Sequence, residues 1–335
     1  MRILKLTEET QKDILENLLK RSPNHYGEFE GRVNAIIEEV RAKRDEAVFA
    51  YTKQFDGAEI SADNILVTED EIREAYELVD ETLLSVIRKS LVNIKKYHEK
   101  QLPNSWFTTE DGVILGQKVT ALETAGVYVP GGKAVYPSSV LMNVLPAKVA
   151  GVDRIVMCTP PGRDGKVYPS TLVAAKEAGV DEIYKVGGAQ AIAAMAFGTE
   201  SIPKVDKIVG PGNIYVVLAK KAVFGYVSID SIAGPSEILV LADETANPRY
   251  VAADLLSQAE HDEMASAILI TTSQKLADEV SKEVDGFVAE LSRKEIIQKS
   301  LDHYGYILVA DTMDEAIATV NEIASEHMEI VTKDP

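Results

Sequence analysis

Two adjacent residues near the C-terminal end, Glu326 and His327, have the side-chain types that proton transfer requires. An imidazole can take up and return a proton near neutral pH, and a carboxylate beside it is what a proton-transfer site needs. The pattern of residues 311–330 predicts a helix whose apolar stripe runs through Ala324 to His327. His327 would therefore face inward, which leaves two interpretations open: a satisfied core histidine, or a base in a pocket that the helix covers.

A second pair of residues, Gln258 and His261, is spaced for metal binding. Both are predicted to lie in a helix that begins after Asn247-Pro248, and residues three apart share one helical face. Such a pair more often makes surface hydrogen bonds, and glutamine is an uncommon zinc ligand. The one cysteine, Cys158, lies in the apolar segment RIVMC, where a buried structural thiol is expected. A metal site would therefore use nitrogen and oxygen ligands.

Three glycine-containing turns follow apolar segments that are typical of strands, at residues 126–132, 186–190 and 209–213. Glycine lets backbone N–H groups approach an anion, and the helix that follows adds unpaired donors. A single turn of this kind has an equally good structural explanation, which is that its glycines only allow a tight connection from a strand to a helix. Three in succession favour a nucleotide at the carboxyl ends of the strands. Gln190 and Asn213, just after two of the turns, could contact a ribose or an amide.

The elements that position these residues follow from hydrophobic periodicity. The first hundred residues favour helices, with a capping box at Thr68 and Glu71. Asp111-Gly112 predicts the turn of a hairpin. The repeat Val-Asp-x-Ile opens three predicted strands, each followed by a helical stretch, which is typical of βα units in a parallel sheet. The copies begin at Val152, Val180 and Val205.

Composition limits the partners of the chain. Its 335 residues favour two domains or one large α/β domain, and 46% hydrophobic with 26% charged residues is ordinary for a soluble globular protein. A net charge of −18 argues against nucleic acid or an anionic membrane as the main partner. No apolar run is long enough for a membrane span, and the first residues lack a secretory signal. With a single cysteine, the expected location is the cytoplasm.

Six motifs in register resemble the histidinol dehydrogenase family: GVYVPGG, VGGAQAIAAMAFGTE, VDKIVGPGN, AGPSEILVLAD, DLLSQAEHD and ASEHMEI. The resemblance runs from the N-terminal helices to the last residue. It implies an α/β fold with two incomplete Rossmann-like domains, each with a parallel sheet, plus N-terminal helices. The expected division is a helical arm at 1–24, a discontinuous domain at 25–126 and 237–335 that carries the zinc and the catalytic residues, and an inserted NAD-contacting domain at 127–236.

The same resemblance implies the chemistry. Histidinol dehydrogenases oxidise L-histidinol through L-histidinaldehyde to L-histidine, with NAD as oxidant, one zinc ion per site and a homodimeric assembly. Glu326 would activate water for the aldehyde step, and His327 would bind substrate and take up protons in both steps. The remaining residues carried over are Tyr128, Gln190 and Asn213 for NAD, Ser236 for substrate, and Gln258 and His261 for both zinc and substrate.

The chain departs from the family pattern in two places. Ile232 stands where a proline is common, which is a tolerable change in a loop. The family continues for roughly a hundred residues beyond Pro335, a part that supplies an aspartate ligand to zinc and a histidine to the partner subunit's site. We therefore expect the chain as given to turn over little substrate. A nucleotide-binding module of the same fold without turnover remains an alternative, and so does another zinc enzyme such as a hydrolase, although the glycine turns argue against a hydrolase.

Overall fold

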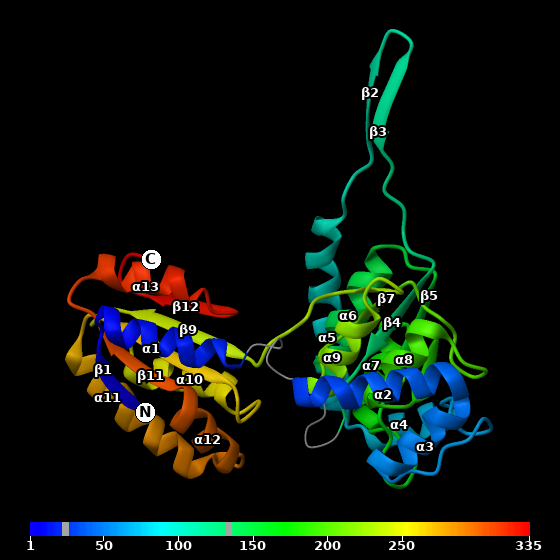
Figure 1. The fold of residues 1–335 in the computed structure, drawn as a ribbon, viewed down its shortest axis with the longest axis horizontal. Coiled ribbons are helices and arrows are strands. Elements are labelled where there is room, and N and C mark those ends of the chain that lie inside the picture. Colours follow the sequence, from blue (N-terminus) through cyan, green and yellow to red (C-terminus); the bar gives the residue numbers. More distant parts are fainter. Residues whose placement is uncertain (22–26, 132–135) are drawn as a thin grey trace. The chain divides into compact units, whose positions relative to one another are not determined.

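The computed structural model describes residues 1–21, 27–131 and 136–335, and it divides into two compact units (Figure 1). One unit contains residues 26–233, and the other contains residues 1–25 together with 234–335. Each unit is built on a five-stranded sheet whose paired strands are all parallel. The predicted α/β class with two parallel sheets is confirmed.

The sheet of the 26–233 unit has the strand order β6-β5-β4-β7-β8. Its strands are β4 (Thr124–Tyr128), β5 (Arg154–Thr159), β6 (Glu182–Lys185), β7 (Lys207–Val209) and β8 (Ser228–Ile229). The three copies of the Val-Asp-x-Ile repeat lead into β5, β6 and β7, as predicted. The helices that follow β4 to β7 in turn are α6 (Pro137–Val149), α7 (Pro169–Ala178), α8 (Gly188–Phe197) and α9 (Ile214–Val223).

Four helices at the beginning of this unit cover the sheet and its helices. They are α2 (Gly27–Lys43), α3 (Asp45–Asp56), α4 (Glu69–Leu78) and α5 (Glu81–His98), followed by a short 3-10 turn, η2 (Glu99–Gln101). The predicted capping box opens α4, where Glu71 N donates to Thr68 Oγ1 at 3.2 Å and Thr68 N donates to Glu71 Oε2 at 2.8 Å.

The expected domain division differs from this structure. Residues 26–126 pack with 127–233, and not with the C-terminal segment. The reason is that their apolar faces pack against the helices of this unit: Val33, Ile36 and Val40 of α2 share one core with Ile192 of α8. Helices α4 and α5 contribute in the same way to a second core with α6 and α7. The apolar stripes of these helices do not by themselves indicate which sheet they cover.

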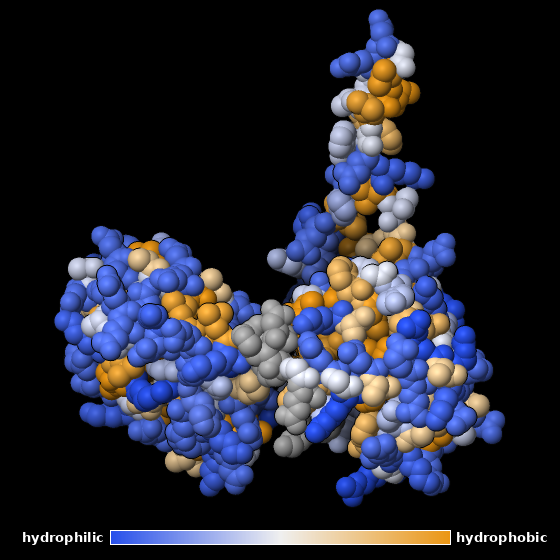
Figure 2. All heavy atoms as spheres, in the orientation of Figure 1, coloured by the Kyte–Doolittle hydropathy of each residue, from blue (hydrophilic) through white to orange (hydrophobic). Residues whose placement is uncertain are grey.

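A hairpin extends from this unit without a covering layer (Figure 1). Strands β2 (Trp106–Glu110) and β3 (Val113–Gln117) pair antiparallel around Asp111-Gly112, as predicted, with Gly112 in the left-handed region at φ +76°. Every residue of both strands is exposed, and Figure 2 shows apolar side chains gathered along the hairpin.

The other unit has the strand order β1-β11-β10-β9-β12. Its strands are β1 (Arg2–Lys5), β9 (Glu237–Ala242), β10 (Ser266–Thr271), β11 (Gly305–Val309) and β12 (His327–Val331). The helices are α1 (Glu8–Leu19), α10 (Pro248–Ala259), α11 (Gln274–Glu290), α12 (Lys294–Tyr304) and α13 (Met313–Ile323). They contribute to two cores that share the sheet, one with α10, α11 and α12 and one with α1 and α13. The predicted N-terminal arm is therefore integrated here, because β1 pairs with β11 along its whole length.

Two of the predicted helices end earlier than expected. Helix α13 ends at Ile323, because Ala324 adopts left-handed backbone angles, and His327 then opens β12 and pairs with Ile238 of β9. The prediction that His327 lies on a helix is therefore wrong. Helix α10 ends at Ala259, so His261 lies in the following turn and does not share a helical face with Gln258. Among the helices of the described residues, none combines the length and apolar character that crossing a membrane would need.

Candidate functional site

A cavity of about 680 Å³ lies at the carboxyl ends of strands β4, β6 and β7. It brings together the three residues that the family resemblance assigned to NAD. Tyr128 ends β4, Gln190 lies in the first turn of α8 after β6, and Asn213 precedes α9 after β7. The lining also includes, among others, Ile36, Phe55, Asp56, Gly188 and Tyr215.

Tyr128 holds one of the glycine turns in place. Its side chain is buried, and its hydroxyl accepts a hydrogen bond from Gly188 N at 3.0 Å. Burial raises the pKa of the Tyr128 hydroxyl well above its ordinary value, so the group stays neutral. Gly188 has φ +67°, a conformation that glycine adopts without strain. The turn at 186–190, which follows β6, is therefore set by Tyr128 of β4, two strands away in the sheet.

Gln190 has an unsatisfied acceptor inside the cavity. Its side chain is 1% exposed, and its Oε1 atom has no hydrogen-bond partner among the described residues. Buried polar atoms are almost always paired, so each exception requires an explanation. A ligand that donates a hydrogen bond to this atom is one such explanation. The cavity therefore fits a molecule with hydroxyl or amide donors, as a dinucleotide has.

Asn213 has a structural function that the sequence-based prediction did not include. It caps α9, and its Oδ1 accepts from Tyr215 N at 3.0 Å and Val216 N at 3.3 Å. Because that oxygen is already paired, the amide nitrogen is the atom of Asn213 that suits a ligand. The third glycine turn, at 209–213, is positioned by this cap.

Two residues that sequence reasoning missed hold the same turn from behind. Lys220 is buried; its Nζ donates to Gly210 O at 2.9 Å and forms an ion pair with Asp230, whose other oxygen accepts from Gly210 N at 2.8 Å. Gly210 lies so close to Tyr128 that an added Cβ would be 2.0 Å from its carbonyl oxygen. No local pattern predicts this cluster, because a lysine in a helix is normally expected to be exposed, and Lys220 is buried only by the packing of α9 in the unit.

The predicted proton-transfer residues lie in the other unit, at the amino end of β12. His327 Nδ1 is 3.0 Å from Glu237 O, and since a carbonyl can only accept, Nδ1 carries the hydrogen of this bond. In the neutral ring Nε2 is then the basic nitrogen. Glu326 N donates to Glu237 Oε2 at 3.4 Å, and the Glu326 and His327 side chains are about half-exposed, 55% and 50%. The interpretation of His327 as a core histidine is therefore wrong.

Glu237, which sequence reasoning missed, is held by an arginine. Arg21 is 2% exposed; it donates to Glu237 Oε1 at 2.6 Å and to Met264 O at 2.8 Å. Arg21 and Glu237 are 216 positions apart in the chain, so only the sheet brings them together. One carboxylate therefore ties the segment that carries Glu326 and His327 to a buried cation.

The other predicted residues of this unit lie at the same edge of the sheet. Ser236 precedes β9, and its carbonyl accepts from Ser266 N of β10 at 3.0 Å. Gln258 is partly buried at the end of α10, and His261 is exposed before β10. The amino ends of β9, β10 and β12 therefore collect these residues, whereas the NAD candidates lie at carboxyl ends in the other unit. The pKa of Glu329 is raised by burial and then by Asp254, four residues before Gln258.

The metal prediction has two candidate ligands in this region. His261 N donates to Gln258 O at 3.0 Å, which places the two residues in one turn. Over residues 1–21, 27–131 and 136–335, no group of three or more His, Cys, Asp or Glu side chains could hold a metal ion. A catalytic zinc usually has three protein ligands, so the described residues do not make a complete zinc site. Cys158 is buried, with a raised thiol pKa caused by that burial, as expected for a structural thiol.

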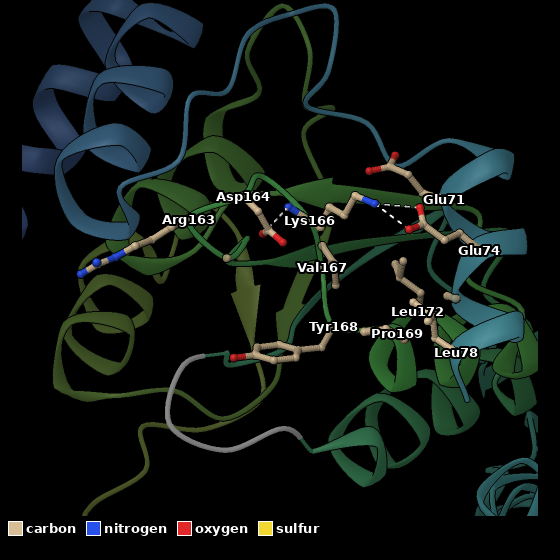
Figure 3. A pocket seen from close by; sticks show the side chains of 12 residues that line it. Glu71, Glu74, Leu78, Arg163, Asp164, Lys166, Val167, Tyr168, Pro169 and Leu172 are labelled. Carbon is tan, nitrogen blue, oxygen red and sulfur yellow. Dashed lines mark hydrogen bonds and ion pairs between the residues drawn. The ribbon is translucent and has the colours of Figure 1, made fainter. Parts of the chain in front are cut away.

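A second cavity, of about 620 Å³, lies between α4 and α7 in the 26–233 unit. Figure 3 shows Lys166 directed toward Glu74, and its Nζ donates to both oxygens of that carboxylate at 2.7 and 2.8 Å. Asp164 accepts from Lys166 N at 3.1 Å. These charged groups satisfy one another, and none of the predicted site residues lines this cavity.

Comparison with known proteins identifies the family. The sequence model of the family described as histidinol dehydrogenase matches residues 19–335. The chain belongs to the histidinol dehydrogenase family. It is 59% identical over 304 residues to histidinol dehydrogenase from Bacillus licheniformis, covering 90% of this chain and 71% of that protein. It is 54% identical over 329 residues to the Caldanaerobacter subterraneus protein of that name, covering 98% and 76%.

A solved histidinol dehydrogenase has the same fold. The crystal structure from Elizabethkingia anophelis superposes with a TM-score of 0.92 at 38% identity, over 100% of this chain and 76% of that one. The resemblance that the six motifs indicated is confirmed. Histidinol dehydrogenases are NAD-dependent dehydrogenases of histidine biosynthesis, which agrees with the predicted oxidoreductase class.

Proposed function

We propose that this chain provides the nucleotide cavity and the proton-transfer residues for oxidation of L-histidinol through L-histidinaldehyde to L-histidine. The observation that carries the proposal is the unpaired Oε1 of Gln190, buried in a cavity that Tyr128 and Asn213 also line. An acceptor kept unpaired there supports a dinucleotide with hydroxyl and amide donors. Family membership supplies the reaction.

NAD, when bound, supplies the hydride acceptor for each of the two oxidations. In the first, Nε2 of His327 takes the hydroxyl proton of the substrate, because Nδ1 is engaged with Glu237 O. In the second, the Glu326 carboxylate takes a proton from the water that adds to the aldehyde carbon and passes it to the former carbonyl oxygen, which gives the hydrate. His327, after releasing its first proton to solvent, then takes a hydroxyl proton from this hydrate. Ser236 and His327 contact the substrate in this proposal.

The zinc ion would be held by Gln258 and His261. Gln258 and His261, which lie in one turn, supply two neutral donors for the ion and for substrate. Two neutral ligands leave the double positive charge uncompensated, so we expect weak affinity from this chain.

We also propose a homodimer, as the family implies. The hairpin β2–β3 supports it: Trp106, Phe107, Ile114 and Leu115 are between 54% and 73% exposed. A lone two-stranded hairpin is marginally stable, so a second copy that covers it would stabilise both. Sedimentation of the chain and of Ile114→Asp tests this, because the variant should lower the mass if the hairpin forms the interface.

The stoichiometry of NADH tests the reaction. A protein that carries this chain together with the rest of its family pattern should yield two NADH for each L-histidinol. The reason is that one water molecule is added and two hydrides are removed at the same carbon. Accumulation of aldehyde with one NADH would contradict the two-step assignment. Nucleotide binding without any NADH would favour the alternative of a binding module of this fold.

A further inference from the structure

A second unpaired acceptor lies in the same cavity as Gln190. Asp56 is the last residue of α3, lines the cavity, and has a buried Oδ2 atom with no hydrogen-bond partner in the described part of the chain. Gly57, in the left-handed region at φ +72°, ends the helix at this point. The helix end therefore leaves the carboxylate at the cavity wall, and no sequence motif indicates this position.

An unpaired carboxylate in such a position is costly. Burial raises the pKa of Asp56 to about 6. The Tyr51 hydroxyl donates to Glu39 at 2.5 Å, and Asn213 Oδ1 is itself an acceptor. Arg32 and Gln54 also line the cavity, but neither forms a hydrogen bond with Asp56 Oδ2. Because buried acceptors normally find a donor, the natural source of one here is a ligand.

Two unpaired acceptors in one cavity limit the ligand that fits. It must bring hydrogen-bond donors and no negative charge to Asp56, which excludes a phosphate at that position. Vicinal sugar hydroxyls meet both conditions, because a carboxylate can accept from two donors at once. Ile36, Phe55 and Tyr215 add apolar and aromatic surface that suits a planar base.

The lining also indicates which end of the dinucleotide this cavity holds. The apolar and aromatic lining, with Ile36, Phe55 and Tyr215, suits the uncharged adenine ring better than the polar, positively charged nicotinamide ring. The part held here is then the non-reacting end, adenosine. We propose that Asp56 accepts hydrogen bonds from the adenosine ribose hydroxyls of bound NAD and disfavours NADP, whose phosphate occupies one of those positions. This rests on the nucleotide site proposed above and deepens it.

Calorimetric titration of the chain with NAD, ADP-ribose and NADP, together with thermal unfolding without ligand, tests the assignment. Wild type should bind NAD and ADP-ribose, and NADP about tenfold more weakly. Asp56→Asn should lose about tenfold in affinity for NAD and ADP-ribose, and its discrimination against NADP should shrink. Its unliganded midpoint should be unchanged or higher, since the buried charge is removed. The control Asp63→Asn, an exposed residue outside the cavity, should change none of these.

Each other outcome overturns the assignment. A lower midpoint for Asp56→Asn with an unchanged preference for NAD over NADP would show a structural role. Loss of affinity for nicotinamide mononucleotide, with ADP-ribose unaffected, would place the other ribose at Asp56. Failure of wild type to bind NAD, or no loss of NAD affinity in Gln190→Leu, would overturn the proposed nucleotide site itself, and this inference with it.

Discussion

Replacing Glu237 by glutamine tests the connection between the buried arginine and the proposed acid–base segment. Arg21 is 2% exposed in its side chain and Glu237 28%, with a separation of 2.6 Å, so the pair is largely shielded from solvent. Removing one partner of a buried pair typically costs about 3–5 kcal/mol, because the remaining charge is left uncompensated. Glutamine keeps one acceptor oxygen in the same place, so we expect about 3 kcal/mol in the free energy of unfolding.

Hydrogen exchange measured on peptides from β9 and β12 would show whether the loss of stability lies in this sheet. The hydrogen bond from His327 Nδ1 to the backbone oxygen of Glu237 does not involve the substituted side chain, so it should be retained. Glu237 does not line the nucleotide cavity, so nucleotide affinity should be unaffected. Glu283→Gln is the matched control, since its pair with Arg249 is exposed, with side-chain exposures of 62% for Arg249 and 37% for Glu283. That control should cost less than about 1 kcal/mol. Equal, small losses for both variants would refute the view that Arg21 depends on Glu237.

Three further outcomes follow. His327→Gln should impair oxidation of both histidinol and histidinaldehyde, whereas Glu326→Gln should spare the first, and equal losses measured in separate half-reactions would oppose that division. For Asp56, whose folded pKa of about 6 exceeds the unfolded value of 3.8, wild-type stability should fall as pH rises between these values. Above pH 6, Asp56→Asn should therefore be more stable than wild type by about 1–2 kcal/mol, a value reduced because the carboxylate is partly exposed to solvent. Chemical unfolding at several pH values measures this, and a stability difference that does not change with pH would contradict it. Zinc titration by calorimetry should show weak binding that Gln258→Ala and His261→Ala reduce further, and tight binding retained in both would mean other ligands.

Local patterns were sufficient for much of this protein. The Val-Asp-x-Ile repeat predicts β5, β6 and β7 because period, apolar runs and following helices all lie within a few residues of one another. The capping box at Thr68 and the turn at Gly112 are equally local, since their hydrogen bonds and backbone angles involve neighbours in sequence. The six family motifs were also sufficient for the class of enzyme.

Tertiary structure decided what depends on distant partners. The stripe through Ala324 is helical in pattern, but pairing of His327 with Ile238 on β9 makes the end a strand and half-exposes the imidazole. Residues 26–126 have amphipathic helices that would suit either sheet, and packing against α8 and α6 assigns them to the first.

The candidate site divides in the same way. Gln190 and Asn213 follow glycine turns that predict the carboxyl ends of strands, so the sequence suggested them, whereas Tyr128, the last residue of β4, was implied by the family resemblance. Asp56 and Glu237 acquire their importance through burial and through partners far away in the chain, and no local signal records either. Desolvation and charge pairing are properties of the packed molecule, because both depend on which groups exclude water from one another.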